Sequence, residues 1–233
     1  KCINDNKSDK FGGMSPFYFL AWTTTPWTLP SNTALTLGGK IEYSFVKTFN
    51  QYTKEKITVV LATSLIKKVF SKNFFNVEDE NDLDIFKVSD SKIPYYITSS
   101  FKGVDFENLK YERIWDEAPL PIENPENAFR VILGDFVTTE DGTGIVHTAP
   151  TFGADDYKAA KSAKPEVPPL LVLDKNGNKV PLVDLKGKFI DDIGMISGKY
   201  VKNEYYKEDK VPEKSVDVEI AIILKEKNLA FKV

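Results

Sequence analysis

Short β-prone segments interrupted by prolines are the feature that most constrains how this chain can fold. Residues 17–23 are aromatic and end in threonine, a composition that favours a buried strand. Pro26 and Pro30 follow, and since proline has no backbone N–H to donate, residues 24–32 are expected to form a loop or strand edge of fixed shape. Further segments with strand-like composition are 41–47, 57–61, 93–98, 128–133, 145–148 and 170–173.

Three segments carry apolar residues at helical spacing, namely 62–70, 154–164 and 216–227. Asp155 and Asp156 would lie in the first turn of the second helix, where the helix dipole favours acidic side chains. Many short strands with few helices between them predict a mainly β fold with α insertions, in which helices decorate a closed β-barrel core.

The chain has 233 residues, enough for one large domain or two small ones, and we expect residues 1–233 to form a single domain. It does not begin with Met, which indicates a fragment of a longer protein. No apolar run approaches the roughly 20 residues that span a bilayer, and the first residues lack a signal-peptide pattern. We therefore expect a cytoplasmic protein without a membrane partner.

The residue counts also limit the possible chemistry. One Cys and one His are too few for a zinc site of the usual kind, so no metal site is predicted. The net charge is -3, whereas a domain that binds nucleic acid through phosphates alone is usually basic. Any RNA contact must therefore be local, or supported by another part of the parent protein.

The first candidate segment is WTTTPWTLPSN, residues 22–32. It holds four threonine hydroxyls and an asparagine amide within eleven residues, and two prolines restrict its backbone. Hydroxyls both donate and accept hydrogen bonds, so this loop is suited to hold a water, a ribose or an ester carbonyl. The alternative interpretation is a strand edge whose threonines are present for β propensity alone.

The second candidate segment is GTGIVHTAPTFGADDY, residues 142–157. Its glycines allow the backbone to approach a ligand closely. His147, the only histidine of the chain, ends an apolar strand, and Asp156 follows after a turn. A carboxylate at a helix start facing a strand end is well placed to pair with an ammonium group. The alternative interpretation is a histidine with a structural role.

Together, and in this order, the two segments resemble the editing insertion of isoleucyl-tRNA synthetases. Valyl and leucyl enzymes typically place Arg before the first proline, whereas this chain has Thr25-Pro26-Trp27. The resemblance covers nearly the whole chain, although only the two motifs are highly specific. The synthetase signatures for amino-acid activation are missing, since the HIGH motif needs two histidines. ATP and Mg would therefore serve only the absent catalytic domain.

The resemblance implies roles for individual residues of the first segment. Thr23, Thr24 and Thr25 match the part of the family motif that contacts the terminal adenosine and the attacking water. Thr24 and Thr25 are therefore predicted to be catalytic and Thr23 to bind substrate. Asn32 matches a position linked to editing, and Trp27 is predicted to form part of the pocket wall.

In the second segment, His147 matches the residue that limits the side-chain pocket. Asp156 matches the aspartate that pairs with the substrate α-ammonium, and it is predicted to act in both binding and catalysis. We expect these two residues to share one cavity with the threonine-rich loop.

The resulting hypothesis is an editing hydrolase that deacylates mischarged Val-tRNA(Ile) after transfer and excludes isoleucine by size. One methylene gives limited discrimination by binding alone, and these synthetases are the case for which that limit is best known. A second site that rejects the larger side chain adds selectivity. No cofactor is expected for editing, the partners are the tRNA 3′ end and a valine moiety, and the chain is expected to be a monomer. The alternatives are a non-catalytic module that docks the tRNA acceptor end, valyl- or leucyl-type editing specificity, or a generic β-barrel with no site.

Overall fold

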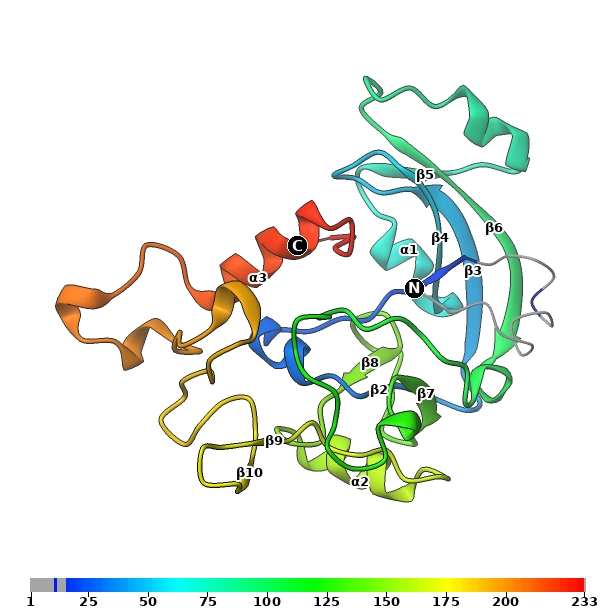
Figure 1. Ribbon diagram of the computed structural model, residues 1–233. Helices are drawn as coiled ribbons and strands as arrows, with labels where there is room; N and C mark the ends of the chain where they lie inside the picture. Colours follow the sequence, from blue (N-terminus) through cyan, green and yellow to red (C-terminus); the bar gives the residue numbers. More distant parts are fainter. Residues whose placement is uncertain (1–10, 12–15, 233) are drawn as a thin grey trace.

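The computed structural model describes residue 11 and residues 16–232. Its largest sheet is the curved five-stranded one at the right of Figure 1, in the order β1-β4-β3-β6-β5. The long strand β3 is antiparallel to both β4 and β6, whereas β1 and β5 join as short parallel edge strands. The bounds are β1 Tyr18–Phe19, β3 Glu42–Phe49, β4 Lys56–Ala62, β5 Phe74–Asn76 and β6 Ile93–Lys102.

A three-stranded sheet in the order β7-β2-β8 carries part of the site. Its central strand, β2 (Ala34–Leu37), is parallel to β7 (Arg130–Leu133) and antiparallel to β8 (Ile145–Thr148). All four residues of β2 are buried, as expected for a strand flanked on both edges. A two-stranded ribbon pairs β9 (Val172–Leu173) with β10 (Lys179–Val180).

The α-helices are short and lie outside the sheets (Figure 1). They are α1 (Ile66–Val69), α2 (Ala154–Ser162) and α3 (Val216–Glu226). The Ser215 hydroxyl caps α3 by accepting the backbone N–H of Val218. The 3-10 helices are η2 Pro26–Ser31, η3 Thr63–Leu65, η4 Glu80–Ile85, η5 Gly103–Phe106, η6 Pro125–Asn127, η7 Gly194–Ile196, η8 Asn203–Tyr205 and η9 Glu208–Lys210. No helix in the described part of the chain is long and apolar enough to cross a membrane.

The prediction of a closed barrel is wrong for the described residues, which form a mixed α/β arrangement with several sheets. The five- and three-stranded sheets meet through isolated links, such as the bridge between Trp22 and Val146 and the hydrogen bond from the Ala62 N–H to the Thr143 carbonyl. The chain leaves the five-stranded sheet soon after β1, and it then enters η2, whose first residue is Pro26. A continuous ladder therefore does not pass from one sheet to the other.

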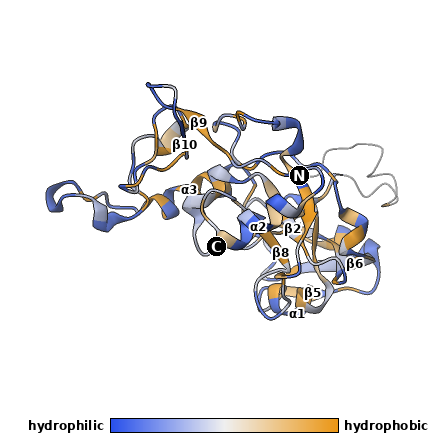
Figure 2. Cartoon of the chain, turned by 90° about the horizontal axis from the view of Figure 1, so that it is seen from below, coloured by the Kyte–Doolittle hydropathy of each residue, from blue (hydrophilic) through white to orange (hydrophobic). Residues whose placement is uncertain are grey.

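Four hydrophobic clusters support this architecture, and two of them are the largest. An aromatic cluster lies between the two larger sheets, with Phe17, Phe45 and Phe106 all fully buried. A second cluster packs beneath α3 and includes Leu182 and Ile220. Figure 2 shows hydrophobic residues along β2 and β8, and a hydrophilic loop that projects away from the rest before α3.

Most predicted elements are found, with differences at their ends. The strands predicted at 41–47, 57–61, 93–98, 128–133 and 145–148 correspond to β3, β4, β6, β7 and β8. The segment predicted as a helix at 62–70 divides into η3 and α1, and the strand predicted at 17–23 shrinks to β1. Strands β2 and β5 were not predicted from the sequence.

Candidate active site

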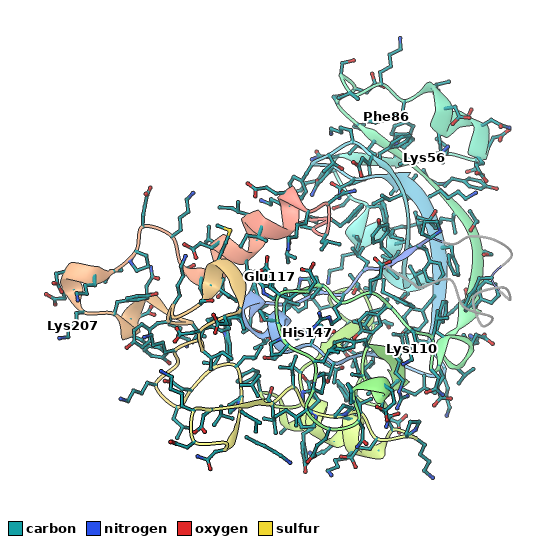
Figure 3. All side chains as sticks on the ribbon, in the orientation of Figure 1. Lys56, Phe86, Lys110, Glu117, His147 and Lys207 are labelled. Atoms are coloured by element: carbon teal, nitrogen blue, oxygen red, sulfur yellow. The ribbon has the colours of Figure 1, made fainter. Side chains whose placement is uncertain are left out.

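His147, the third residue of β8, is the buried polar side chain around which the candidate site is built (Figure 3). It pairs with Leu35 of β2 in the ladder, and its exposed fraction is 9%. Burial lowers the pKa of its imidazole from 6.5 to about 4, because the charged form would lose its hydration. The ring is therefore uncharged at neutral pH.

Both ring nitrogens of His147 have partners in the segment of residues 22–32. Nε2 lies 2.8 Å from the Thr28 hydroxyl, and Nδ1 lies 3.3 Å from the amide nitrogen of Asn32. The Thr28 hydroxyl also donates to the Thr25 carbonyl at 2.9 Å, within the turn that begins η2. Thr28 was not singled out from the sequence, because nothing distinguishes it there from the three threonines before it.

Asn32 is held by its own set of hydrogen bonds. Its amide nitrogen donates one proton to the Ala34 carbonyl at 2.8 Å, and the Thr148 carbonyl and His147 Nδ1, both at 3.3 Å, share the other. Its amide oxygen accepts the Tyr111 hydroxyl at 2.6 Å. Burial raises the pKa of Tyr111 well above its usual value, so this hydroxyl keeps its proton. Tyr111 was also missed from the sequence, because it lies far from both motifs along the chain.

The first half of the threonine segment is exposed, unlike the second. Thr24 and Thr25 are exposed and Thr23 is half-buried. The Thr23 hydroxyl accepts the backbone N–H of Thr25 at 3.0 Å and lies 3.4 Å from the Thr25 hydroxyl. The expected loop of fixed shape is therefore present, with hydroxyls at its surface.

Trp27 joins η2 to two other elements. Its backbone N–H donates to the carboxylate of Asp217 in α3 at 2.8 Å. Its ring meets Phe152 edge-on, with ring centroids 5.0 Å apart. Burial raises the pKa of Asp217. The sequence did not indicate that Asp217 would support the loop.

Asp156 lies in the first turn of α2, as the sequence predicted. Its carboxylate accepts the backbone N–H of Ala149 at 2.9 Å. It packs closely against Gly153, where an added Cβ would come within 2.8 Å of the Asp156 carboxyl carbon. Burial, and to a smaller extent Asp155, raise the pKa of Asp156. The second carboxylate oxygen retains acceptor capacity for a ligand.

Two cavities of about 540 Å³ and 550 Å³ border the loop, and His147, Leu29 and Phe19 line both of them. The first also reaches Asn32 and Tyr111. The second is also bordered by Trp22, Thr23 and Gly142. Volumes of this size and mostly apolar walls are typical of pockets for small organic ligands.

The structure brings together some of the predicted site residues and not others. Thr23, Asn32 and His147 line the cavities, so the threonine-rich loop and the histidine do meet. Thr24 and Thr25 lie at the surface beside this region rather than in the cavity walls. The expectation that Asp156 shares a cavity with His147 is not met, because its carboxylate is turned toward the Ala149 N–H. Trp27 packs on Phe152 and lines neither of these two cavities.

Among the described residues, no group of His, Cys, Asp and Glu side chains is arranged to hold a metal ion. Around His147 the site consists of hydroxyls, amides and one neutral imidazole, and the half-buried carboxylate of Asp156 lies outside the two cavities.

No model of a protein family matches the chain. It is 48% identical over 227 residues to the isoleucine--tRNA ligase of Cytophaga hutchinsonii, a match that covers 93% of this chain and 20% of that protein. The isoleucine--tRNA ligase of Bacteroides fragilis is 45% identical over 233 residues, with the same coverage. The chain thus spans about a fifth of the length of these relatives.

Solved structures give a weaker likeness. The leucyl-tRNA synthetase fragment GlLeuRS-CP1 aligns with a TM-score of 0.45 and 16% identity, over 68% of this chain and 52% of that one. The editing domain of the P. falciparum cytosolic leucyl-tRNA synthetase aligns with a TM-score of 0.44 and 14% identity, over 66% and 52% of the two chains.

Proposed function

Because the chain is homologous to a segment that makes up about a fifth of isoleucine--tRNA ligases, we propose that it is an editing hydrolase for Val-tRNA(Ile). The observation that supports this most directly is the apolar cavity shared by His147 and the threonine-rich loop. A cavity with mainly apolar walls and a fixed imidazole among its few buried polar side chains is suited to sort amino acids by the size of an apolar side chain.

His147 is proposed to set the upper size limit. Its ring is buried, uncharged and held at both nitrogens, so it cannot swing aside at low cost. Forcing an extra methylene against a fixed wall is steeply repulsive, so isoleucine is rejected where valine fits. A pKa of about 4 together with two occupied nitrogens makes His147 a poor general base, which favours the steric role.

The proposed reaction is the hydrolysis of an ester. Water attacks the carbonyl carbon, the bond between that carbon and the ribose oxygen breaks, and the proton from water ends on the ribose oxygen. An ester is already activated, so orientation of the water and stabilisation of the developing oxyanion suffice. We assign this task to the hydroxyls of Thr24 and Thr25, which are exposed beside the cavity. The proposed reaction uses neither a metal nor a cofactor.

Asp156 is proposed to receive the α-ammonium of the amino acid. An ammonium that enters a partly dry site needs a compensating charge. The carboxylate has one oxygen on the Ala149 N–H, which orients it, and the second oxygen is the proposed acceptor. Ammonium binding would lower the pKa of Asp156, which burial raises in the free protein.

The test is hydrolysis of Val-tRNA(Ile) by the 233-residue chain, with Ile-tRNA(Ile) as the matched control. We expect release of valine, little release of isoleucine, and unchanged rates after addition of EDTA. Equal hydrolysis of both substrates would overturn the size-exclusion role, and a loss of activity with EDTA would overturn the metal-free mechanism.

A second candidate is a module that only docks the tRNA acceptor end. The positions of Thr24, Thr25 and Asp156 outside the cavity walls favour it. The net charge of -3 argues against tight RNA binding by the chain alone. Binding of tRNA(Ile) without any hydrolysis would favour docking over editing.

We further propose that the chain acts in the cytoplasm as a monomer, with the 3′ end of mischarged tRNA(Ile) and its valine moiety as partners. Use of ATP and Mg would belong to parts of the ligase outside this chain. A panel of other mischarged tRNAs separates this specificity from valyl- and leucyl-type editing.

A further inference from the structure

We infer that Tyr111 and Thr28 are positioning residues that hold His147 in one ring orientation with its proton on Nε2, and thereby set the size limit of the cavity. The link to selectivity rests on the proposed editing function. The position of the proton follows from hydrogen-bond geometry alone and is tested separately.

The Thr25 carbonyl, which only accepts hydrogen bonds, lies at one end of a chain of hydrogen bonds through His147. The Thr28 hydroxyl donates its single proton to this carbonyl at 2.9 Å. Toward the Nε2 atom of His147, at 2.8 Å, the same hydroxyl oxygen is therefore left to accept. This places a proton on Nε2.

On the other side of His147 lies the Asn32 amide. The neighbours of this amide determine its orientation. Its nitrogen faces the carbonyls of Ala34 and Thr148, and its oxygen faces the Tyr111 hydroxyl. If the amide turned over, its oxygen would face two carbonyl oxygens, which repel it. The Nδ1 atom of His147, 3.3 Å from this NH₂ group, is therefore an acceptor without a proton.

The two ends of the chain of hydrogen bonds independently give the same result. All bonds run in one direction, from Tyr111 through Asn32, His147 and Thr28 to Thr25. Rotation of the imidazole by half a turn would place carbon atoms against both the Asn32 amide and the Thr28 hydroxyl, so both bonds to the ring would be lost. The His147 ring that borders the cavity is consequently held on two sides. Thr28 of η2 holds Nε2, and Asn32, which Tyr111 orients, holds Nδ1.

NMR of the ring nitrogens tests the position of the proton directly, because the chain contains a single histidine. With 15N-labelled histidine at neutral pH, we expect one protonated nitrogen, Nε2, and one unprotonated nitrogen, Nδ1. Two averaged nitrogen signals, or a proton on Nδ1, would overturn the inference whether or not the protein edits.

Substitutions test the two positioning residues. Tyr111→Phe removes the hydroxyl that orients Asn32, and Thr28→Val removes the acceptor at Nε2 with little change in volume. Because each end fixes the ring independently, we expect shifted but still distinct His147 nitrogen signals in each single variant, averaged signals in the double variant, and wild-type signals in Thr28→Ser. The matched controls are Tyr205→Phe and Thr138→Val, both at exposed positions, which should leave the signals unchanged.

The effect on selectivity is measured as the ratio of kcat/KM for Val-tRNA(Ile) to that for Ile-tRNA(Ile). This ratio should fall by roughly threefold to tenfold in Tyr111→Phe and Thr28→Val, the effect of one buried hydrogen bond. The loss should come mainly from faster hydrolysis of Ile-tRNA(Ile), whereas a merely destabilised protein would lose activity on both substrates. If the nitrogen signals change but the ratio does not, the positioning role in selectivity is wrong while the proton assignment stands. If the wild type hydrolyses neither substrate, the proposed function fails instead.

Discussion

The two halves of the threonine segment differ sharply in their surroundings. Thr24 and Thr25 are exposed, and the Thr25 hydroxyl lies 3.4 Å from the Thr23 hydroxyl. In the second half, Thr28 and Asn32 are buried and bound to His147. The same residue types therefore have different surroundings within a few positions of each other.

Under the proposed editing function, this difference would separate the residues that shape the cavity from those that orient the water. A buried hydroxyl with both its donor and its acceptor engaged is well suited to hold a wall in place. An exposed hydroxyl can reorient toward a water or an ester oxygen as the substrate arrives. We expect substitutions in the buried half to change stability and selectivity, and substitutions in the exposed half to change rate.

The largest expected effect is the pH dependence of stability that His147 causes in the buried half. Burial lowers its pKa from 6.5 to about 4, so between these values the unfolded chain binds more protons than the folded one. The free energy of unfolding should therefore fall as the pH drops through this window, by about 3 kcal/mol in total. Urea unfolding of the wild type and His147→Gln across the window measures it. Parallel pH profiles would show that His147 is not buried in this way.

The next effect concerns Asp156, whose side chain is more buried than Thr24 and Thr25 and more exposed than Thr28 and Asn32. Asp156→Ala should slow deacylation of Val-tRNA(Ile) by roughly 100-fold, because the α-ammonium loses its charged partner. Asp155→Ala is the matched control, since its carboxylate is exposed and pairs with Lys158. The wild-type rate should also fall as the pH drops through the raised pKa of Asp156. Full activity of Asp156→Ala would remove this residue from the site.

A smaller effect on the free energy of unfolding is expected from Thr28→Val. The variant leaves the Nε2 proton of His147 buried without a partner, which should cost about 2 kcal/mol of unfolding free energy. Thr28→Ser should restore most of it. An unchanged midpoint of urea unfolding in Thr28→Val would mean that hydrogen bonds in the buried half contribute no more to stability than those in the exposed half.

The smallest effect is expected in the exposed half. Thr24→Val and Thr25→Val should each slow deacylation by roughly tenfold, because each removes one of several groups that orient the water. Their unfolding free energies should stay within about 0.5 kcal/mol of the wild type, as for most surface substitutions. Rates of single-turnover deacylation and urea unfolding, with Thr138→Val as the control, measure both. A large loss of stability with an unchanged rate would reverse the comparison.

The sequence by itself determined the local elements and the residues that carry the family likeness. Alternation and β-branched composition indicated β3, β4 and β8, because these strands follow from short-range patterns. The two motifs indicated the relationship to isoleucine--tRNA ligases, which the 48% identity over 227 residues shows independently. The prolines indicated that the threonine segment would leave the sheet, and it does so as η2.

Only the tertiary structure decided which polar groups meet. Tyr111 reaches Asn32 across 79 positions of the chain, and Asp217 reaches the Trp27 N–H across 190. It also decided that Asp156 turns to the Ala149 N–H, and that the ladders remain separate sheets instead of a closed barrel. The physical reason is that propensity and periodicity act over a few residues, whereas a buried polar atom takes whichever partner the packing of distant segments brings within 3 Å or so.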